Sequence, residues 1–163
     1  MKTKDAIKQT HEFSNMVLNG YLGDFTDEEL LQRPGEGCNH VAWQLGHLIS
    51  SECSLLNMVA PGAAIELPAG FEENHGKENS KSDDASQFCS KAEYLELLGK
   101  VKEATFAALD GMADEDLSKD GPEDMRQFCP TVGSLFVLIG THPMMHAGQL
   151  VPIRRRLDKP VVM

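Results

Sequence analysis

The sequence predicts an all-α protein, a four-helix bundle, and three observations support this prediction. Four segments carry apolar residues at alternating spacings of three and four, the period of a helix that turns one face to a bundle core. No segment shows sustained alternation of period two, so no strand is expected. A long polar stretch, residues 60–90, separates the second and third helices, and such a connection can return along the bundle so that the two helices run parallel.

Length and composition are those of one domain spanning residues 1–163 that can bury a core without disulfides or metals. The net charge of -10, from 25 acidic and 15 basic residues, opposes contact with a phosphate backbone, so no nucleic-acid partner is expected. The sequence has no apolar run of membrane-spanning length, and its first residues are too polar for a signal peptide. We therefore expect a cytoplasmic protein without a membrane partner.

The first helix is expected from about Lys4 to Leu22, with an imperfect apolar face. Thr26 and Glu29 form a capping box for a short turn, which Pro34 ends. The residues of the apolar face are Ile7, Phe13, Val17, Leu18 and Tyr21.

The second helix is expected to begin near Asn39, a good N-cap residue, and to end at Pro61 and Gly62. Apolar residues surround much of it, which indicates deep burial against several neighbours. Its central stripe consists of Val41, Leu45, Leu48, Leu55 and Val59. The segment from Ala60 to Ser90 then breaks all periodicity, so we expect it to wrap the surface, carry function or lack order in part.

The third helix is expected to open at the capping box formed by Ser90 and Glu93, and the fourth is expected from Thr131 to about Leu157. Pro143 lies inside the fourth helix, where it should produce a kink rather than an end because the apolar stripe continues on both sides. Arg154, Arg155 and Arg156 should fan out as a solvated helix end. The apolar positions of the third helix are Tyr94, Leu98, Val101, Thr105, Ala108 and Met112, and those of the fourth include Phe136, Ile139, Pro143, His146, Leu150 and Ile153.

The four cysteines are widely spaced and form no CxxC pair, which favours free thiols that are buried or half-buried over disulfides or a zinc knuckle. They are Cys38, Cys53, Cys89 and Cys129.

Two histidines of the fourth helix, His142 and His146, are the first candidates for a site. Residues at i and i+4 project from the same side of a helix, so the two imidazoles can share a metal ion. From the spacing alone, a metal pair and a hydrogen-bonded core pair are equally well supported. The segment is not a HExxH protease motif, because Pro143 follows the first histidine.

The remaining histidines are less informative. His47 lies beside Trp43 at i and i+4, and the two could simply form a packed pair. His40 lies near the start of the same helix and could approach the same cavity, whereas His11 and His75 are expected at the surface. Two glycines next to candidate ligands, Gly46 and Gly148, suggest close helix approach or ligand access, or are merely tolerated.

Two segments together resemble a known family. NHVAWQLGHL at residues 39–48 and THPMMHAGQ at residues 141–149 look like the signature segments of the DinB-like (damage-inducible) superfamily. The resemblance extends over nearly the whole chain and implies a four-helix bundle of up-down-down-up topology. It also implies a divalent metal ion, nickel or zinc, held by His47, His142 and His146. Only the resemblance joins His47 to the other two.

The resemblance also suggests a function. Members of this superfamily include thiol-dependent enzymes that use bacillithiol or mycothiol, such as S-transferases and a maleylpyruvate isomerase. A metal-bound small thiol would attack an electrophilic substrate, and metal-bound water would instead make a hydrolase. The resemblance implies a homodimer as well. The alternatives are a non-catalytic, stress-related metal-binding bundle and a plain structural bundle with core histidines.

No catalytic residue besides the ligands stands out. His40, Glu52 and His11 are the weak candidates for a general base, and Gln149, near the ligands, could orient a bound group.

Overall fold

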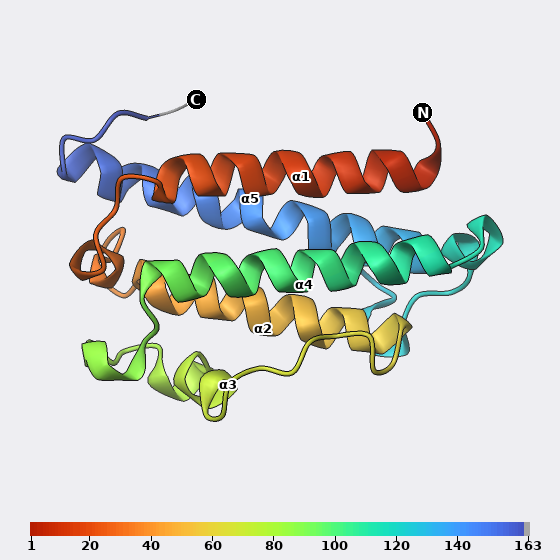
Figure 1. Cartoon of the computed structure of the whole chain (residues 1–163), viewed down its shortest axis with the longest axis horizontal. Helices are drawn as coiled ribbons and strands as arrows, with labels where there is room; N and C mark the ends of the chain where they lie inside the picture. Colours follow the sequence, from red (N-terminus) through yellow and green to blue (C-terminus); the bar gives the residue numbers. More distant parts are fainter. Residues whose placement is uncertain (162–163) are drawn as a thin grey trace.

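Four long helices make up the computed structural model, which describes residues 1–161 (Figure 1). They are α1 (Thr3–Leu22), α2 (Val41–Val59), α4 (Lys91–Gly111) and α5 (Val132–Arg156). No β-strand occurs among the described residues; one isolated bridge joins Asp120 to Thr131. The expected all-α bundle is therefore confirmed, and the helix ends lie within a residue or two of their expected positions. None of the described helices combines the length and the hydropathy needed to cross a membrane.

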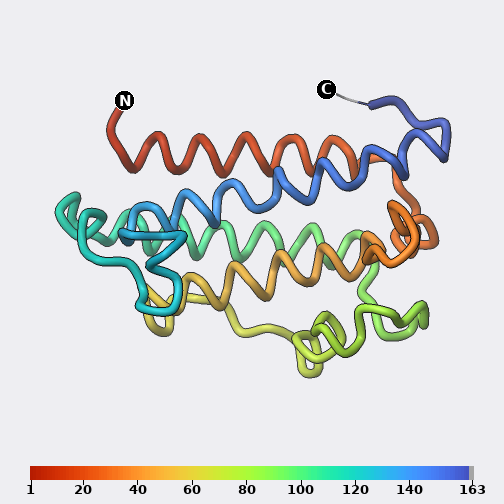
Figure 2. Tube along the Cα trace, turned by 180° about the vertical axis from the view of Figure 1, so that it is seen from behind, coloured from red at the N-terminus to blue at the C-terminus, as the bar shows by residue number. Residues whose placement is uncertain are grey.

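The helices run up-down-down-up. Followed by colour from red to blue, α1 and α5 run in one direction and α2 and α4 in the other, and the view from behind shows the same order (Figures 1 and 2). The parallel pair α2 and α4 is possible because residues 60–90 travel back along the outside of the bundle before α4 begins. This segment contains the one-turn helix α3 (Phe71–Asn74) and two short 3₁₀ turns.

The core consists of two apolar clusters with a polar layer between them. One cluster includes Leu18, Leu45 and Leu150, and the other includes Leu56 and Leu135. The positions between them on α1, α2 and α4 belong to buried polar residues, which are His11, Glu52 and Thr105. The expectation of a surface His11 is wrong, because the His11 side chain faces the core. Phe13, which was expected on the apolar face of this helix, is 49% exposed instead.

The helix starts follow their capping residues. The reciprocal bonds expected between Ser90 and Glu93 are present, and the Thr131 side chain accepts from the backbone N–H of Ser134. The expectation for α2 is wrong by one residue. His40 rather than Asn39 is the N-cap, because its Nδ1 accepts the backbone N–H of Trp43 at 3.0 Å and so replaces the usual oxygen acceptor.

The basic end of α5 also differs from the expectation. Arg155 and Arg156 are exposed, but Arg154 is only 1% exposed. Its guanidinium forms a two-pronged pair with the Asp24 carboxylate, with N···O distances of 2.6 and 3.1 Å, and donates to the carbonyl oxygens of Tyr21 and Pro160. The hydrogen bonds from Arg154 hold the pKa of Asp24 below its usual value. Arg154 therefore ties the end of α1 to the end of α5.

The segment 60–90 is held against α2 and α4 by buried side chains. His75, expected at the surface, is 4% exposed and uses both ring nitrogens: Nδ1 donates to the Phe71 carbonyl at 2.7 Å, and Nε2 accepts from the Tyr94 hydroxyl at 2.6 Å. The Trp43 indole N–H donates to the Gly76 carbonyl at 3.0 Å. These bonds order a segment whose sequence shows no periodicity.

Gly46 makes room for this anchor. A Cβ atom at residue 46 would lie 1.9 Å from the His75 ring, whereas a Cβ at Gly148 would meet nothing within 4 Å. Because both ring nitrogens of His75 are bonded, the ring has no free position to move to. We expect Gly46→Ala to lower the free energy of unfolding by about 1–3 kcal/mol.

Gly148→Ala is the matched control, since alanine at an open helix position should raise the free energy of unfolding by roughly 0.5–1 kcal/mol. Urea unfolding followed by circular dichroism measures both changes. Equal behaviour of the two variants would contradict the proposed role of Gly46.

Helix α5 continues through Pro143, so the alternative of two helices that break at His142 is wrong. The expected kink at Pro143 stays a prediction.

All four cysteines are free, and Cys38 is exposed rather than buried or half-buried.

Candidate metal centre

Three histidines meet at the level of the polar layer. His47 comes from α2, and His142 and His146 come from successive turns of α5. The ring centroids of the three are 4.9–5.5 Å apart, and one nitrogen atom from each lies within 4.8 Å of the others. Within residues 1–161, no other group of three His, Cys, Asp or Glu side chains converges in this way. The expected convergence is confirmed; the role of the three as metal ligands stays a prediction.

The donor atoms fit a divalent ion. The Nε2 atoms of His142 and His146 are 3.2 Å apart. Zinc–nitrogen bonds of about 2.0–2.1 Å place two tetrahedral ligand atoms about 3.3 Å apart, so these two atoms already have suitable spacing. Three protein nitrogens would leave a fourth position for another ligand.

The protonation state of the cluster also suits a metal. Burial lowers the pKa of His47, lowers that of His142 to about 4 and lowers that of His146 to about 3. The neighbouring imidazoles further lower the pKa of His142 and His146. At neutral pH the three rings are therefore uncharged, which leaves a lone pair on each ring for a cation.

The tautomer of His146 follows from a residue that the sequence analysis missed. Gln44, buried on α2, donates its Nε2 to the Asn39 carbonyl at 2.8 Å, and its Oε1 lies 3.0 Å from Nδ1 of His146. Because the amide nitrogen is already used, the amide oxygen must face His146 and accept the Nδ1 proton. Nε2 of His146 is then unprotonated and directed toward His142. The only signal in the sequence was a glutamine in an otherwise apolar stretch of α2.

Gln44→Leu should weaken metal binding while the fold survives. The substitution keeps the side-chain size but removes the acceptor that fixes the His146 ring, and loss of such an outer partner typically costs about 10- to 100-fold in metal affinity. Competition with a zinc chelator of known affinity measures the change. Gln149→Leu, at an exposed site on α5, is the control and should leave the affinity unchanged. Equal affinity in both variants would show that Gln44 does not orient the ligand.

His47 is held from two sides. Its ring stacks on Trp43, with centroids 5.1 Å apart and planes 6° from parallel, so the expected packed pair is present. The Ser51 hydroxyl lies 3.4 Å from Nδ1 of the same ring. Both neighbours are on α2, and the ring also contacts His142 and His146 of α5, at centroid distances of 5.3 and 5.5 Å.

Three residues considered as further ligands or bases lie elsewhere. The N-cap role of His40 occupies Nδ1, and its Nε2 lies 3.0 Å from the Ser82 carbonyl, so His40 does not approach the cluster. His11 and Glu52 are buried in the polar layer, where Nε2 of His11 is 3.5 Å from a carboxylate oxygen of Glu52, whose other oxygen accepts from Thr105 at 2.7 Å. Gln149 is exposed on α5, and its expected role in orienting a bound group stays a prediction.

A pocket of about 500 Å³ opens beside the cluster. His47 and His142 line it, so a ligand in the pocket can reach the histidine cluster. The other lining residues are three serines of α2 (Ser50, Ser51 and Ser54), an apolar wall (Leu55, Met125, Leu138 and Met145) and Glu72 of α3. The hydroxyl of Ser50 is buried and has no hydrogen-bond partner among the described residues.

Comparison with known proteins agrees with this architecture. The sequence profile of the DinB superfamily matches residues 10–150, which include both histidine segments. The chain belongs to the DinB superfamily. The family is the one that the segments 39–48 and 141–149 resemble, and the three histidines of those segments lie together in the structure.

Solved structures similar to this DinB superfamily chain share its fold. A conserved protein from Enterococcus faecalis has 19% sequence identity and a TM-score of 0.71, over 98% of this chain and 99% of that one. YfiT from Bacillus subtilis, described as a probable metal-dependent hydrolase with an unusual four-helix bundle topology, has 19% identity and a TM-score of 0.65, over 96% of this chain and 89% of its own. The search of curated proteins finds no match.

Proposed function

We propose that this protein is a divalent-metal-dependent hydrolase of small molecules. The observation that carries the proposal is the cluster of three uncharged imidazoles at the wall of a pocket of about 500 Å³. Three protein ligands with an open position are typical of catalytic rather than structural metal sites. When bound, zinc or nickel would supply a Lewis acid that lowers the pKa of water.

The chain's own side chains have separate tasks in this proposal. His47, His142 and His146 hold the ion, and Gln44 keeps His146 in the tautomer that offers Nε2. The apolar wall of the pocket binds the hydrocarbon part of the substrate and excludes bulk water from the reacting group.

Water is favoured over a small thiol for two reasons. YfiT, a structural neighbour, is described as a hydrolase. In addition, Glu72 is the single acidic residue of the pocket lining, which includes no lysine or arginine. A thiol that carries carboxylate groups would meet a like charge there, and the lining offers no lysine or arginine to bind those groups.

Reloading the metal tests the proposal. The protein is stripped with a chelator, reloaded with zinc or nickel, and assayed against a panel of small esters and amides without thiol and then with added thiol. We expect turnover only after one equivalent of metal is bound, no dependence on thiol, and loss of turnover in His142→Ala. Turnover only with thiol would favour an S-transferase that joins a thiol to an electrophile. A tightly bound metal without turnover would favour the non-catalytic bundle.

A further inference from the structure

We propose that the substrate of this pocket carries a protonated or quaternary amine, which binds to the carboxylate of Glu72. The inference rests on the proposed function for the reaction, but the binding of the amine does not depend on turnover. It combines three features: the charge of the pocket lining, the freedom of the Glu72 carboxylate, and the position of Glu72 between two adjoining cavities.

The pocket beside the histidine cluster has one acidic residue and no basic residue. Glu72 is the acidic residue, and the other two ionisable side chains that line the pocket, His47 and His142, belong to the proposed metal centre. The remaining wall is made of hydroxyl and apolar groups. A ligand with an alkyl part and one positive charge matches this lining, whereas an anion matches no part of it except a bound metal.

The carboxylate of Glu72 is available to a ligand. Glu72 is exposed, and no hydrogen bond or ion pair joins its carboxylate to another described residue, whereas Glu93 bonds to Ser90 and Glu29 to Thr26 and Lys159. The net charge of -10 raises the local concentration of cations around the whole molecule.

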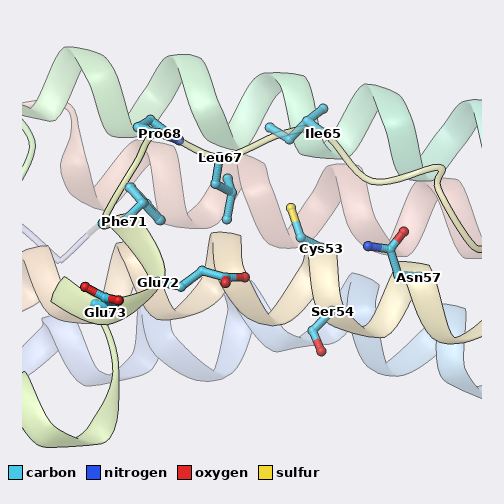
Figure 3. Close-up of a pocket in the computed structure, with 10 residues that line it drawn as sticks. Cys53, Ser54, Asn57, Ile65, Leu67, Pro68, Phe71, Glu72 and Glu73 are labelled. Carbon is cyan, nitrogen blue, oxygen red and sulfur yellow. The ribbon is translucent and has the colours of Figure 1, made fainter.

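Glu72 also lines a second cavity of about 470 Å³ between α2 and residues 65–73 (Figure 3). Ser54 lines both cavities as well, so the two adjoin along α2. In Figure 3 the Glu72 side chain lies along α2 with its carboxylate turned toward Cys53. An amine bound to Glu72 therefore sits where the two cavities adjoin, and its substituents can extend into either cavity.

The second cavity does not supply a nucleophile of its own. Burial, with the nearby charge of Glu52 and Glu72, raises the pKa of the Cys53 thiol to about 11. At neutral pH Cys53 is a protonated thiol, which is a poor nucleophile. The second cavity is therefore a binding region, and its other acidic residue, Glu73, adds to its preference for cations.

Two pairs of probes that differ only in charge test the inference. Choline is compared with 3,3-dimethylbutan-1-ol for binding by calorimetry, and acetylcholine is compared with 3,3-dimethylbutyl acetate for hydrolysis. Both are measured with zinc-loaded protein, with Glu72→Gln, and with Glu78→Gln, an exposed glutamate that lines neither cavity. We expect the cationic probe to bind about two- to fivefold more tightly than its neutral partner.

In Glu72→Gln the ratio of the affinities for the cationic and the neutral probe should fall to about one, and in Glu78→Gln the ratio should stay as in the unchanged protein. An affinity ratio of one in the unchanged protein, or an affinity ratio above one that survives Glu72→Gln, would overturn the inference. A charge preference in binding without hydrolysis of either ester would keep the inference and refute the proposed hydrolase. Hydrolysis of both esters at equal KM would support the proposed hydrolase and refute the inference about the amine.

Discussion

Alanine at His146 should lower the zinc affinity of the protein by more than about 100-fold. Removal of an outer partner of a ligand costs about 10- to 100-fold, so loss of a ligand itself should cost at least the upper end of that range. Among the three proposed ligands, His146 has the most complete support, because Gln44 fixes its ring and its Nε2 lies 3.2 Å from Nε2 of His142. Chelator competition at pH 7.5 measures the affinity, and elemental analysis should give one metal per chain before the change.

Two further variants make this result specific. His142→Ala should lose affinity to a similar extent, because His142 lies on the same face of α5 one turn earlier. Gln149 lies one turn after the cluster at an exposed position. The variant Gln149→Ala should therefore bind metal with the same affinity as the unchanged protein. If His146→Ala bound zinc with unchanged affinity, the three histidines would be core residues rather than ligands, and the proposed function would fail with them.

Arg154→Met should lower the free energy of unfolding by about 2–4 kcal/mol. The substitution puts an apolar chain in the buried site but removes the hydrogen bonds that Arg154 donates to the carbonyl oxygens of Tyr21 and Pro160 and its ion pair with Asp24. The expected loss is not larger because the Asp24 side chain is 46% exposed, so water can replace the guanidinium at that carboxylate. Urea unfolding with a constant m-value measures the change.

The neighbouring arginine provides the matched control. Arg155→Met removes the same charge one residue later at an exposed position, and the stability should change by less than about 0.5 kcal/mol. Arg154→Lys keeps the positive charge but not the planar fork, so it should fall between the two. Similar losses in Arg154→Met and Arg155→Met would show that net charge at the end of α5, and not the buried fork, stabilises the bundle.

The expected homodimer stays a prediction. Sedimentation at several concentrations tests it.

The pattern of neighbouring residues in the sequence was enough to predict the helices and part of the candidate site. The capping residues Ser90 and Thr131 act within one turn, and the alternating spacings of three and four reflect which face of each helix is buried. The i and i+4 spacing placed His142 and His146 on one face for the same reason. All of these features depend on residues close together in the chain.

The misplaced histidines show where local pattern stops. His75 lies in a segment without periodicity, and its burial depends on Gly46 and Tyr94, which are far from it in sequence. His11 faces the core beside Glu52 of α2, with Nε2 3.5 Å from a carboxylate oxygen, and its ring nitrogens have no hydrogen-bond partner among the described residues. Local pattern predicts a polar helix residue at the surface, because the contacts that accompany its burial lie on other helices.

The sequence by itself determined four amphipathic helices, their order and ends, and one pair of imidazoles on a shared face, because periodicity and capping are properties of neighbouring residues. The tertiary structure alone decided which side chains meet across helices: that Gln44 and His47 of α2 join the α5 pair, that Arg154 is buried against Asp24, and that α3 brings Glu72 to the pocket. These contacts depend on how whole helices pack, since the energy that selects them comes from burial between segments far apart in the chain.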